Sequence, residues 1–130
     1  MILIDTSAWV EFLRDTGSPT CNRVDKLLGS RIATCDVIRM EVLAGARSDE
    51  HLQQLRQLLA RATLLPTGSI DYDAAAALYR VCRSRGRTVR KLIDCLIAAV
   101  AIREKTSLLH ADTDFAAIAE VTDLRVDVVG

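Results

Sequence analysis

The order of apolar segments along the chain predicts an α/β domain, in which a mostly parallel sheet lies between layers of helices. Short segments typical of buried strands, such as the apolar run at 1–4 and the segment at 107–110, alternate with longer segments whose apolar residues recur at helical spacing. Parallel strands have this pattern because they are buried on both faces and are joined by helices. At 130 residues the chain has the length of one domain, which we expect to cover residues 1–130.

The first half of the chain contains two predicted strands and four predicted helices. Trp9, Phe12 and Leu13 follow one another at i, i+3 and i+4, which indicates one face of a short helix. Ser18 and Pro19 are typical of a helix start, as N-cap and first helical residue. In chain order we expect a strand at 1–4, a helix after Asp5-Thr6-Ser7, a helix from Pro19 to Gly29, a weak strand at 31–34, a helix at 37–44 capped by Asp36, and a helix at 48–61.

The second half contains three predicted strands and two long predicted helices. The helix Leu92–Arg103 is apolar almost all round and is therefore expected to be buried. Residues 124–128 alternate apolar and polar side chains, which is typical of a half-exposed edge strand. In chain order we expect a strand at Thr63–Leu65, a helix at 71–85 ended by Gly86, the helix Leu92–Arg103, a strand at 107–110 and the edge strand at 124–128.

Composition excludes several classes of protein. Basic and acidic residues number 17 each, which excludes a globally basic nucleic-acid binder but leaves room for a local basic patch. The four cysteines form no CxxC pair and only two histidines are present, so a zinc site is not expected. We expect reduced thiols and a cytoplasmic protein. The N-terminus does not resemble a signal peptide, and the longest apolar run, residues 95–102, is too short to cross a membrane.

Acidic residues follow two of the predicted strands. Asp5 comes directly after the first strand, while Asp112 and Asp114 come shortly after the strand at 107–110. Ligands of parallel α/β sheets bind at the carboxyl ends of the strands, so these carboxylates are candidate site residues. The alternative is a turn or helix-cap role, which Asp-Thr-Asp would also suit. Thr6 and Ser7 could cap the first helix, which makes Asp5 look redundant as a cap.

Asp94 and Glu41 are the other two candidate carboxylates. Asp94 lies in the predicted buried helix with apolar neighbours on every face, and a lone buried carboxylate is costly unless it is paired or bound to a cation. Its alternative role is that of a first-turn acid favoured by the helix dipole. Glu41 lies in a mostly apolar helical segment, and its alternative is a surface position or an ion pair with Arg39 or Arg47.

The four acids Asp5, Glu41, Asp94 and Asp112 would form a metal site if they met at one edge of the sheet. Two carboxylates about 5 Å apart repel by about 3 kcal/mol at an effective dielectric constant of about 20. A divalent cation removes this penalty, and all-oxygen ligands favour Mg²⁺ or Mn²⁺ over zinc. Such a site could hydrolyse a phosphodiester. Spacing alone does not show that the four acids meet.

Several segments together resemble a known family. ILIDTSAW at 2–9, Glu41, IDCLIAA at 93–99 and HADTDF at 110–115 occur in the order typical of PIN-domain ribonucleases and, more narrowly, of VapC-type toxins of bacterial toxin–antitoxin pairs. The resemblance spans the whole chain. It implies a three-layer α/β/α sandwich and an endoribonuclease that uses Mg²⁺, with Mn²⁺ as a substitute. It also implies a cognate antitoxin, an RNA substrate such as tRNA, and a homodimer within a larger toxin–antitoxin complex.

The resemblance also assigns roles to residues. By it, Asp5, Glu41, Asp94 and Asp112 match the catalytic acids, and Asp114 matches a further acid that some members use, so that Asp5, Asp94, Asp112 and Asp114 are the implied metal ligands. Thr6 or Ser7 matches a small hydroxyl residue that orients the first aspartate.

A basic stretch lies between the predicted helices of the second half. Residues 80–91 carry six basic side chains and no acidic one, and they end three residues before Asp94. We expect Arg85, Arg87, Arg90 and Lys91 to bind RNA phosphates beside the acidic site. The alternative is that Arg80 and Arg83 complement a helix C-terminus while the rest are solvated.

Other functions remain open at the level of the sequence. A housekeeping RNA-processing nuclease would use the same site, and a non-catalytic interaction module would have no use for its acids. A receiver or phosphatase domain is the least favoured class, because Asp5-Thr6-Ser7 has no second aspartate beside the first.

Overall fold

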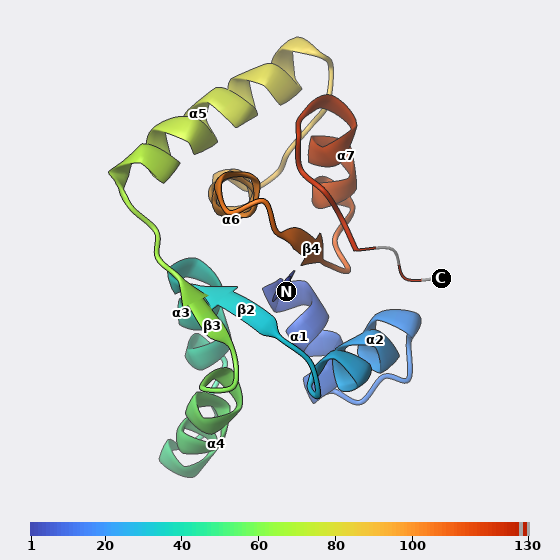
Figure 1. The fold of residues 1–130 in the computed structure, drawn as a ribbon, viewed down its shortest axis with the longest axis vertical. Helices are drawn as coiled ribbons and strands as arrows, with labels where there is room; N and C mark the ends of the chain where they lie inside the picture. The colour runs from blue at the N-terminus through green and yellow to red at the C-terminus, as the bar shows by residue number, and fades with distance from the viewer. Residues whose placement is uncertain (128, 130) are drawn as a thin grey trace.

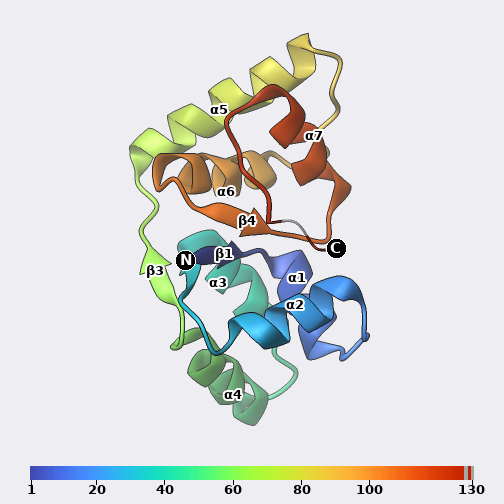
Figure 2. The same ribbon diagram turned by 45° about the vertical axis from the view of Figure 1, so that its right-hand side comes forward.

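The chain folds as an α/β/α sandwich around one parallel sheet, in a computed structural model that describes residues 1–127 and 129. Four strands pair in the order β3-β2-β1-β4. Figures 1 and 2 show α5, α6 and α7 on one side of the sheet and α1 to α4 on the other. The elements are β1 Ile2–Ile4, α1 Thr6–Leu13, α2 Pro19–Leu27, β2 Ile32–Cys35, α3 Asp36–Ala44, α4 Asp49–Leu59, β3 Thr63–Leu65, α5 Ser69–Ser84, α6 Leu92–Arg103, β4 Ser107–Leu109 and α7 Thr113–Val121.

The predicted fold class is confirmed, and most element boundaries agree within two residues. The β1 and β4 strands are buried on both faces, with Leu3, Ile4, Leu108 and Leu109 fully inaccessible, as the continuous apolar runs indicated. The α6 helix is buried along most of its length, since it packs between the sheet and α5. None of the helices in the part of the chain that the structure describes is long and apolar enough to cross a membrane.

The strand order places the carboxyl ends of β1 and β4 at a switch point. The chain proceeds from β1 outward to β2 and β3, and then returns to place β4 on the opposite side of β1. In parallel α/β sheets, the crevice for ligands opens outside the carboxyl ends at such a point. The loops that follow β1 and β4 carry Asp5 and Asp112, so both acids lie at this crevice.

The edge strand predicted at 124–128 is wrong for the residues that the structure describes. Only one bridge forms, between Val126 and Leu108. The amide of Leu108 donates to Arg125, and the amide of Asp127 donates to the carbonyl of Leu108. The β4 strand has only three residues, so its outer edge can form few backbone hydrogen bonds with a further strand. The side chain of Asp127 accepts hydrogen bonds from Arg23 of α2. Residue 128 lies outside the described residues.

Two predicted helix caps also differ. Cys35 occupies the N-cap position of α3, and Asp36 is its first residue, whose carboxylate accepts a hydrogen bond from the amide of Thr67. Asp5 is not redundant as a cap, because it is the N-cap of α1 and its carboxylate accepts from the amide of Ser7. Thr6 and Ser7 use their hydroxyl groups elsewhere.

Candidate active site

Asp5 is fixed where β1 ends and α1 begins. Its Oδ2 accepts hydrogen bonds from the amide of Ser7 at 2.9 Å and from the hydroxyl of Ser7 at 2.5 Å. The same hydroxyl accepts from the amide of Ala111, just beyond β4. Ser7 therefore ties together the carboxyl ends of two neighbouring strands. Burial raises the pKa of Asp5, although the bonds from Ser7 oppose this effect.

Glu41 reaches the same region from α3. It is half-buried, and its Oε1 accepts a hydrogen bond of 2.7 Å from the hydroxyl of Thr6. Within the described residues Glu41 forms no ion pair with Arg39 or Arg47, so that alternative is not observed. The hydroxyl of Ser7 therefore orients Asp5, and the hydroxyl of Thr6 orients Glu41.

Asp94 is the third residue of α6 and is only 6% exposed. Its Oδ2 is buried and has no hydrogen-bond partner among the described residues. Burial, together with the nearby carboxylates of Asp112, Asp5 and Asp114, raises the pKa of Asp94 to about 7. It lies in the first turn of the helix, as the helix-dipole alternative required. That position does not supply its missing partner.

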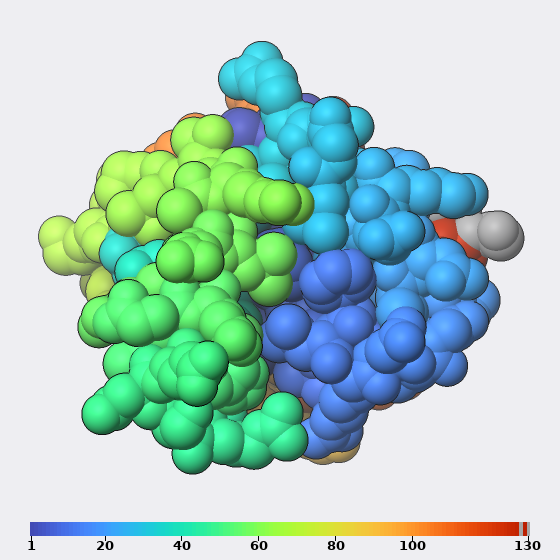
Figure 3. Space-filling view, turned by 90° about the horizontal axis from the view of Figure 1, so that it is seen from below, coloured from blue at the N-terminus to red at the C-terminus, as the bar shows by residue number. Residues whose placement is uncertain are grey.

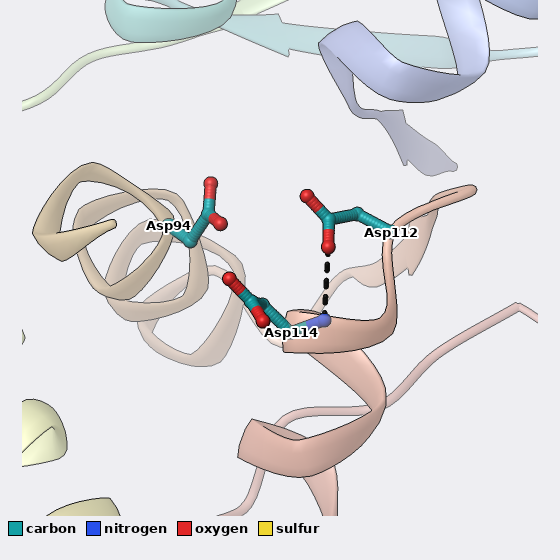
Figure 4. A group of neighbouring side chains, drawn as sticks. All are labelled: Asp94, Asp112 and Asp114. Carbon is teal, nitrogen blue, oxygen red and sulfur yellow. Dashed lines mark hydrogen bonds between the residues drawn. The ribbon is translucent and has the colours of Figure 1, made fainter. Parts of the chain in front are cut away.

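Asp112 and Asp114 complete an acidic cluster with Asp94. Figure 4 shows the three carboxylates directed toward a common space, Asp94 from α6 and the other two from the start of α7. Each offers one oxygen, and these oxygens lie within 4.8 Å of one another. Asp112 is the N-cap of α7, and its Oδ1 accepts from the amide of Asp114 at 2.9 Å.

All four predicted catalytic acids line one cleft. The cleft has a volume of about 400 Å³, and its walls include Asp5, Glu41, Asp94 and Asp112. Lys91 lies at the same cleft. The structure therefore brings together the four acids whose meeting the sequence alone could not show. Asp114 lies beside Asp94 and Asp112.

The predicted basic residues differ from one another in their contacts. Arg85 and Lys91 are exposed. Arg87 forms an ion pair with Glu120 on α7. Arg90 forms ion pairs with Asp112 and Asp114 of the acidic cluster, although its side chain remains largely exposed.

Comparison with known proteins identifies the family. A profile described as the PIN domain matches residues 2–121. The chain belongs to the PIN-domain family. It is 47% identical to ribonuclease VapC11 of Mycobacterium tuberculosis, and to a VapC ribonuclease of Mycobacterium bovis, over 129 residues that cover 96% of this chain and 96% of each relative. Within the PIN-domain family the chain therefore belongs to the VapC ribonucleases.

Solved structures agree with the PIN-domain fold. VapBC2 from Rickettsia felis, bound to a DNA fragment from its promoter, superposes with a TM-score of 0.76 at 19% identity, and 98% of each chain is covered. A toxin–antitoxin complex from Klebsiella pneumoniae gives a TM-score of 0.74 at 23% identity, covering 97% of this chain and 100% of that one.

The donor set of this PIN domain fits a divalent cation. Every candidate ligand is a carboxylate, which suits Mg²⁺ or Mn²⁺ rather than softer metals. The buried Oδ2 of Asp94 has no donor in the described part of the chain, and an unpaired buried carboxylate oxygen is costly unless a cation lies beside it.

Sequence reasoning missed two features of the site. The first is the contact of Arg90 with Asp112 and Asp114, which short-range spacing does not show because about 22 to 24 residues separate the partners. The second is a groove of about 320 Å³ that adjoins the acidic cleft and whose walls come from α1, α3 and α4. The green segment around α4 lies next to the blue α1 on the face shown in Figure 3.

Proposed function

We propose that this chain is the Mg²⁺-dependent endoribonuclease toxin of a toxin–antitoxin pair, and that residues 1–130 form its single domain. One observation carries the proposal: Asp5, Glu41, Asp94 and Asp112 line one cleft, in which a carboxylate oxygen of Asp94 is buried without a partner. The 47% identity to VapC ribonucleases supports an RNA substrate. The VapBC complexes among the structural neighbours support an antitoxin partner.

The acids would divide into ligands and supports. Asp5, Asp94 and Asp112 are the proposed cation ligands, with Asp114 as a further acid beside them. When bound, Mg²⁺ would acidify a water molecule and polarise the phosphate. Ser7 holds the Asp5 carboxylate against β1 and β4, so that its position is set before substrate arrives.

The remaining steps fall to side chains of the cleft. An oxygen of Asp94 or Asp112 that does not hold the cation would take the proton from the attacking water, because each carboxylate has two oxygens and both residues line the cleft. Glu41, held by Thr6, would orient water or ligand from the opposite wall. The water oxygen would bond to phosphorus as the P–O3′ bond breaks, and the leaving O3′ would take up a proton, which gives the 3′-hydroxyl and 5′-phosphate ends that the resemblance to PIN-domain ribonucleases implies.

The test of this function is cleavage of total cellular RNA by the purified chain. It is run with Mg²⁺, with Mn²⁺ and with EDTA, beside Asp5→Asn, Asp94→Asn and the surface control Asp25→Asn. We expect discrete fragments that disappear with EDTA and with the two site variants but persist with the control. Absence of cleavage by folded, antitoxin-free protein across RNA pools that include tRNA and ribosomal RNA would contradict the proposal.

Arg85 and Lys91 are proposed to bind RNA phosphates beside the cleft. Both are exposed, and Lys91 lies at the cleft that holds the acids. Replacing both with Gln should weaken RNA binding and reduce the slope of log affinity against log salt by about 1.5, since each lost phosphate contact accounts for about 0.7 to 0.9. An unchanged slope would contradict this role. The double variant Lys26→Gln/Arg61→Gln serves as the charge-matched control, because these two exposed residues lie on α2 and in the turn before β3.

The groove between α1, α3 and α4 is proposed to hold the antitoxin. Its walls include Leu13, Val42 and Leu55, and it shares Thr6 and Glu41 with the acidic cleft. A bound segment would therefore end beside the catalytic acids. Leu13→Arg should reduce co-purification with the antitoxin while cleavage by the free chain persists. Undiminished co-purification would exclude this groove as the antitoxin site.

We further propose that the chain forms a homodimer, which light scattering of the free chain would test.

A further inference from the structure

Arg90 makes an unusual set of contacts for an exposed arginine. Its side chain is 63% exposed, yet it contacts two carboxylates of the acidic cluster, and its backbone contacts one of them. The backbone amide of Arg90 donates to Oδ2 of Asp114 at 3.1 Å, and Nε lies 3.3 Å from both oxygens of Asp114. Nη2 donates to Oδ1 of Asp112 at 3.1 Å. The side chain therefore spans the two acids at the start of α7.

These contacts divide the carboxylate oxygens of the cluster into two groups. Both oxygens of Asp114 accept from Arg90, and Oδ1 of Asp112 accepts from Arg90 and from the amide of Asp114. The buried Oδ2 of Asp94 has no donor within the described residues. Arg90 thus neutralises one side of the cluster, whereas the buried oxygen of Asp94 accepts no hydrogen bond among the described residues and is compensated only by the charge of Lys91 at the cleft.

We propose that Arg90 is an internal counterion of the metal site, which reserves Asp114 and one oxygen of Asp112 and thereby weakens cation binding in the cleft. This inference rests on the proposed metal-dependent function. It gives Arg90 a positioning role, in place of the phosphate contact expected from its place in the basic stretch. The role depends on the positive charge of Arg90, which its contacts hold beside Asp112 and Asp114.

The expected size of the effect follows from Coulomb's law. A unit positive charge about 6 Å from a divalent ion opposes its binding by roughly tenfold when the dielectric constant is close to that of water. We use this high value because Arg90 is largely exposed. Replacing Arg90 by a neutral residue should therefore tighten cation binding by about tenfold.

The experiment is a calorimetric titration of the metal-free, antitoxin-free full chain with Mn²⁺ alone, in the absence of RNA. It compares the wild type with Arg90→Gln, Arg90→Lys and Arg61→Gln. We expect about tenfold tighter binding for Arg90→Gln. Arg90→Lys keeps the charge and should stay within about twofold of the wild type. Arg61→Gln removes a charge on the turn before β3, outside the cleft, and should leave the affinity unchanged.

Each outcome bears on the proposal separately from the enzymatic function. Unchanged or weaker Mn²⁺ binding by Arg90→Gln, with binding by the wild type intact, overturns the counterion role and leaves the metal site standing. Tighter binding by Arg90→Lys to the same degree as Arg90→Gln also overturns it, because geometry rather than charge would then decide. Absence of Mn²⁺ binding by the wild type contradicts both the metal site and the inference.

Discussion

Replacement of Asp94 by Asn should remove much of the pH dependence of stability in the metal-free protein. Burial and the neighbouring carboxylates raise the pKa of Asp94 to about 7 in the folded chain, whereas an unfolded aspartate has a pKa of about 3.9. Because the folded-state pKa is the higher one, the folded state is favoured while Asp94 is protonated. That contribution is complete below about pH 4 and is lost as the pH rises through about 7.

The magnitude follows from the two pKa values. Between pH 5 and pH 8 the ionisation of Asp94 should lower the free energy of unfolding by about 2.5 kcal/mol. Asparagine has nearly the same shape, and its amide can donate to the carboxylates of Asp112 or Asp114 nearby. At pH 8 without metal, Asp94→Asn should therefore be as stable as the wild type or more so, although it should not cleave RNA.

Urea unfolding from pH 5 to pH 8, in buffer containing EDTA, measures the difference. The matched control is Asp25→Asn, an exposed position on α2, which should keep the pH dependence of the wild type. Addition of Mg²⁺ at pH 8 should stabilise the wild type, because a ligand that binds only the folded state raises the free energy of unfolding. The same addition should not stabilise Asp94→Asn, because this variant lacks one of the proposed cation ligands. An unchanged pH dependence in Asp94→Asn, or a large loss of stability across the whole range, would refute the reasoning and make Asp94 a structural residue.

Three further substitutions test the supports of the site and of the fold. Thr6→Val removes the hydroxyl that binds Glu41 and should lower kcat by about 10-fold or more. The affinity for Mn²⁺ should stay within about twofold of the wild type. A kcat equal to that of the wild type would exclude this positioning role of Thr6. Ser7→Ala removes the hydroxyl that joins the carboxyl ends of β1 and β4, and should cost about 1 kcal/mol in urea unfolding besides reducing cleavage. Arg103→Met leaves the buried Asp71 without its ion-pair partner, although the amide of Gly68 still donates to it, and should cost about 2 kcal/mol at pH 7. The bond from Arg103 holds the pKa of Asp71 below its usual range, so this stabilisation is present above about pH 4 and should vanish as the pH falls further; a constant difference down to about pH 2 would contradict it.

The sequence was sufficient for most of the fold because local patterns and burial agree in this chain. A wholly apolar run marked β1, and Ser18 with Pro19 marked the start of α2, where they occupy the N-cap and first helical positions as predicted. The strand predicted at 124–128 does not form over residues 124–127. An alternation of apolar and polar residues indicates which side chains are half-buried, but not whether a neighbouring strand is long enough to pair with.

The site was harder to predict than the fold, because it depends on where strands end in three dimensions. The number of residues between Asp5 and Asp112 does not indicate how far apart their side chains lie until β1 and β4 are known to be neighbours in the sheet. The basic stretch shows the same limit more sharply. Its charges are evident in the sequence, yet the pairing of Arg87 with Glu120 and of Arg90 with Asp114 depends on the packing of α7 beside α6.

Asp5 and Asp112, which lie between a strand and the helix that follows it, can act both as helix N-caps and as cation ligands. Asp5 caps α1 through Oδ2, and Asp112 caps α7 through Oδ1, so each cap engages one oxygen and fixes the plane of the carboxylate. The second oxygen of each is then held in a defined direction at the cleft that both residues line. A helix that begins directly after a strand thus supplies both a rigid carboxylate and the positive end of its dipole, which offsets part of the repulsion among the acids. The capping residue is for this reason a favourable position from which to build a cation site.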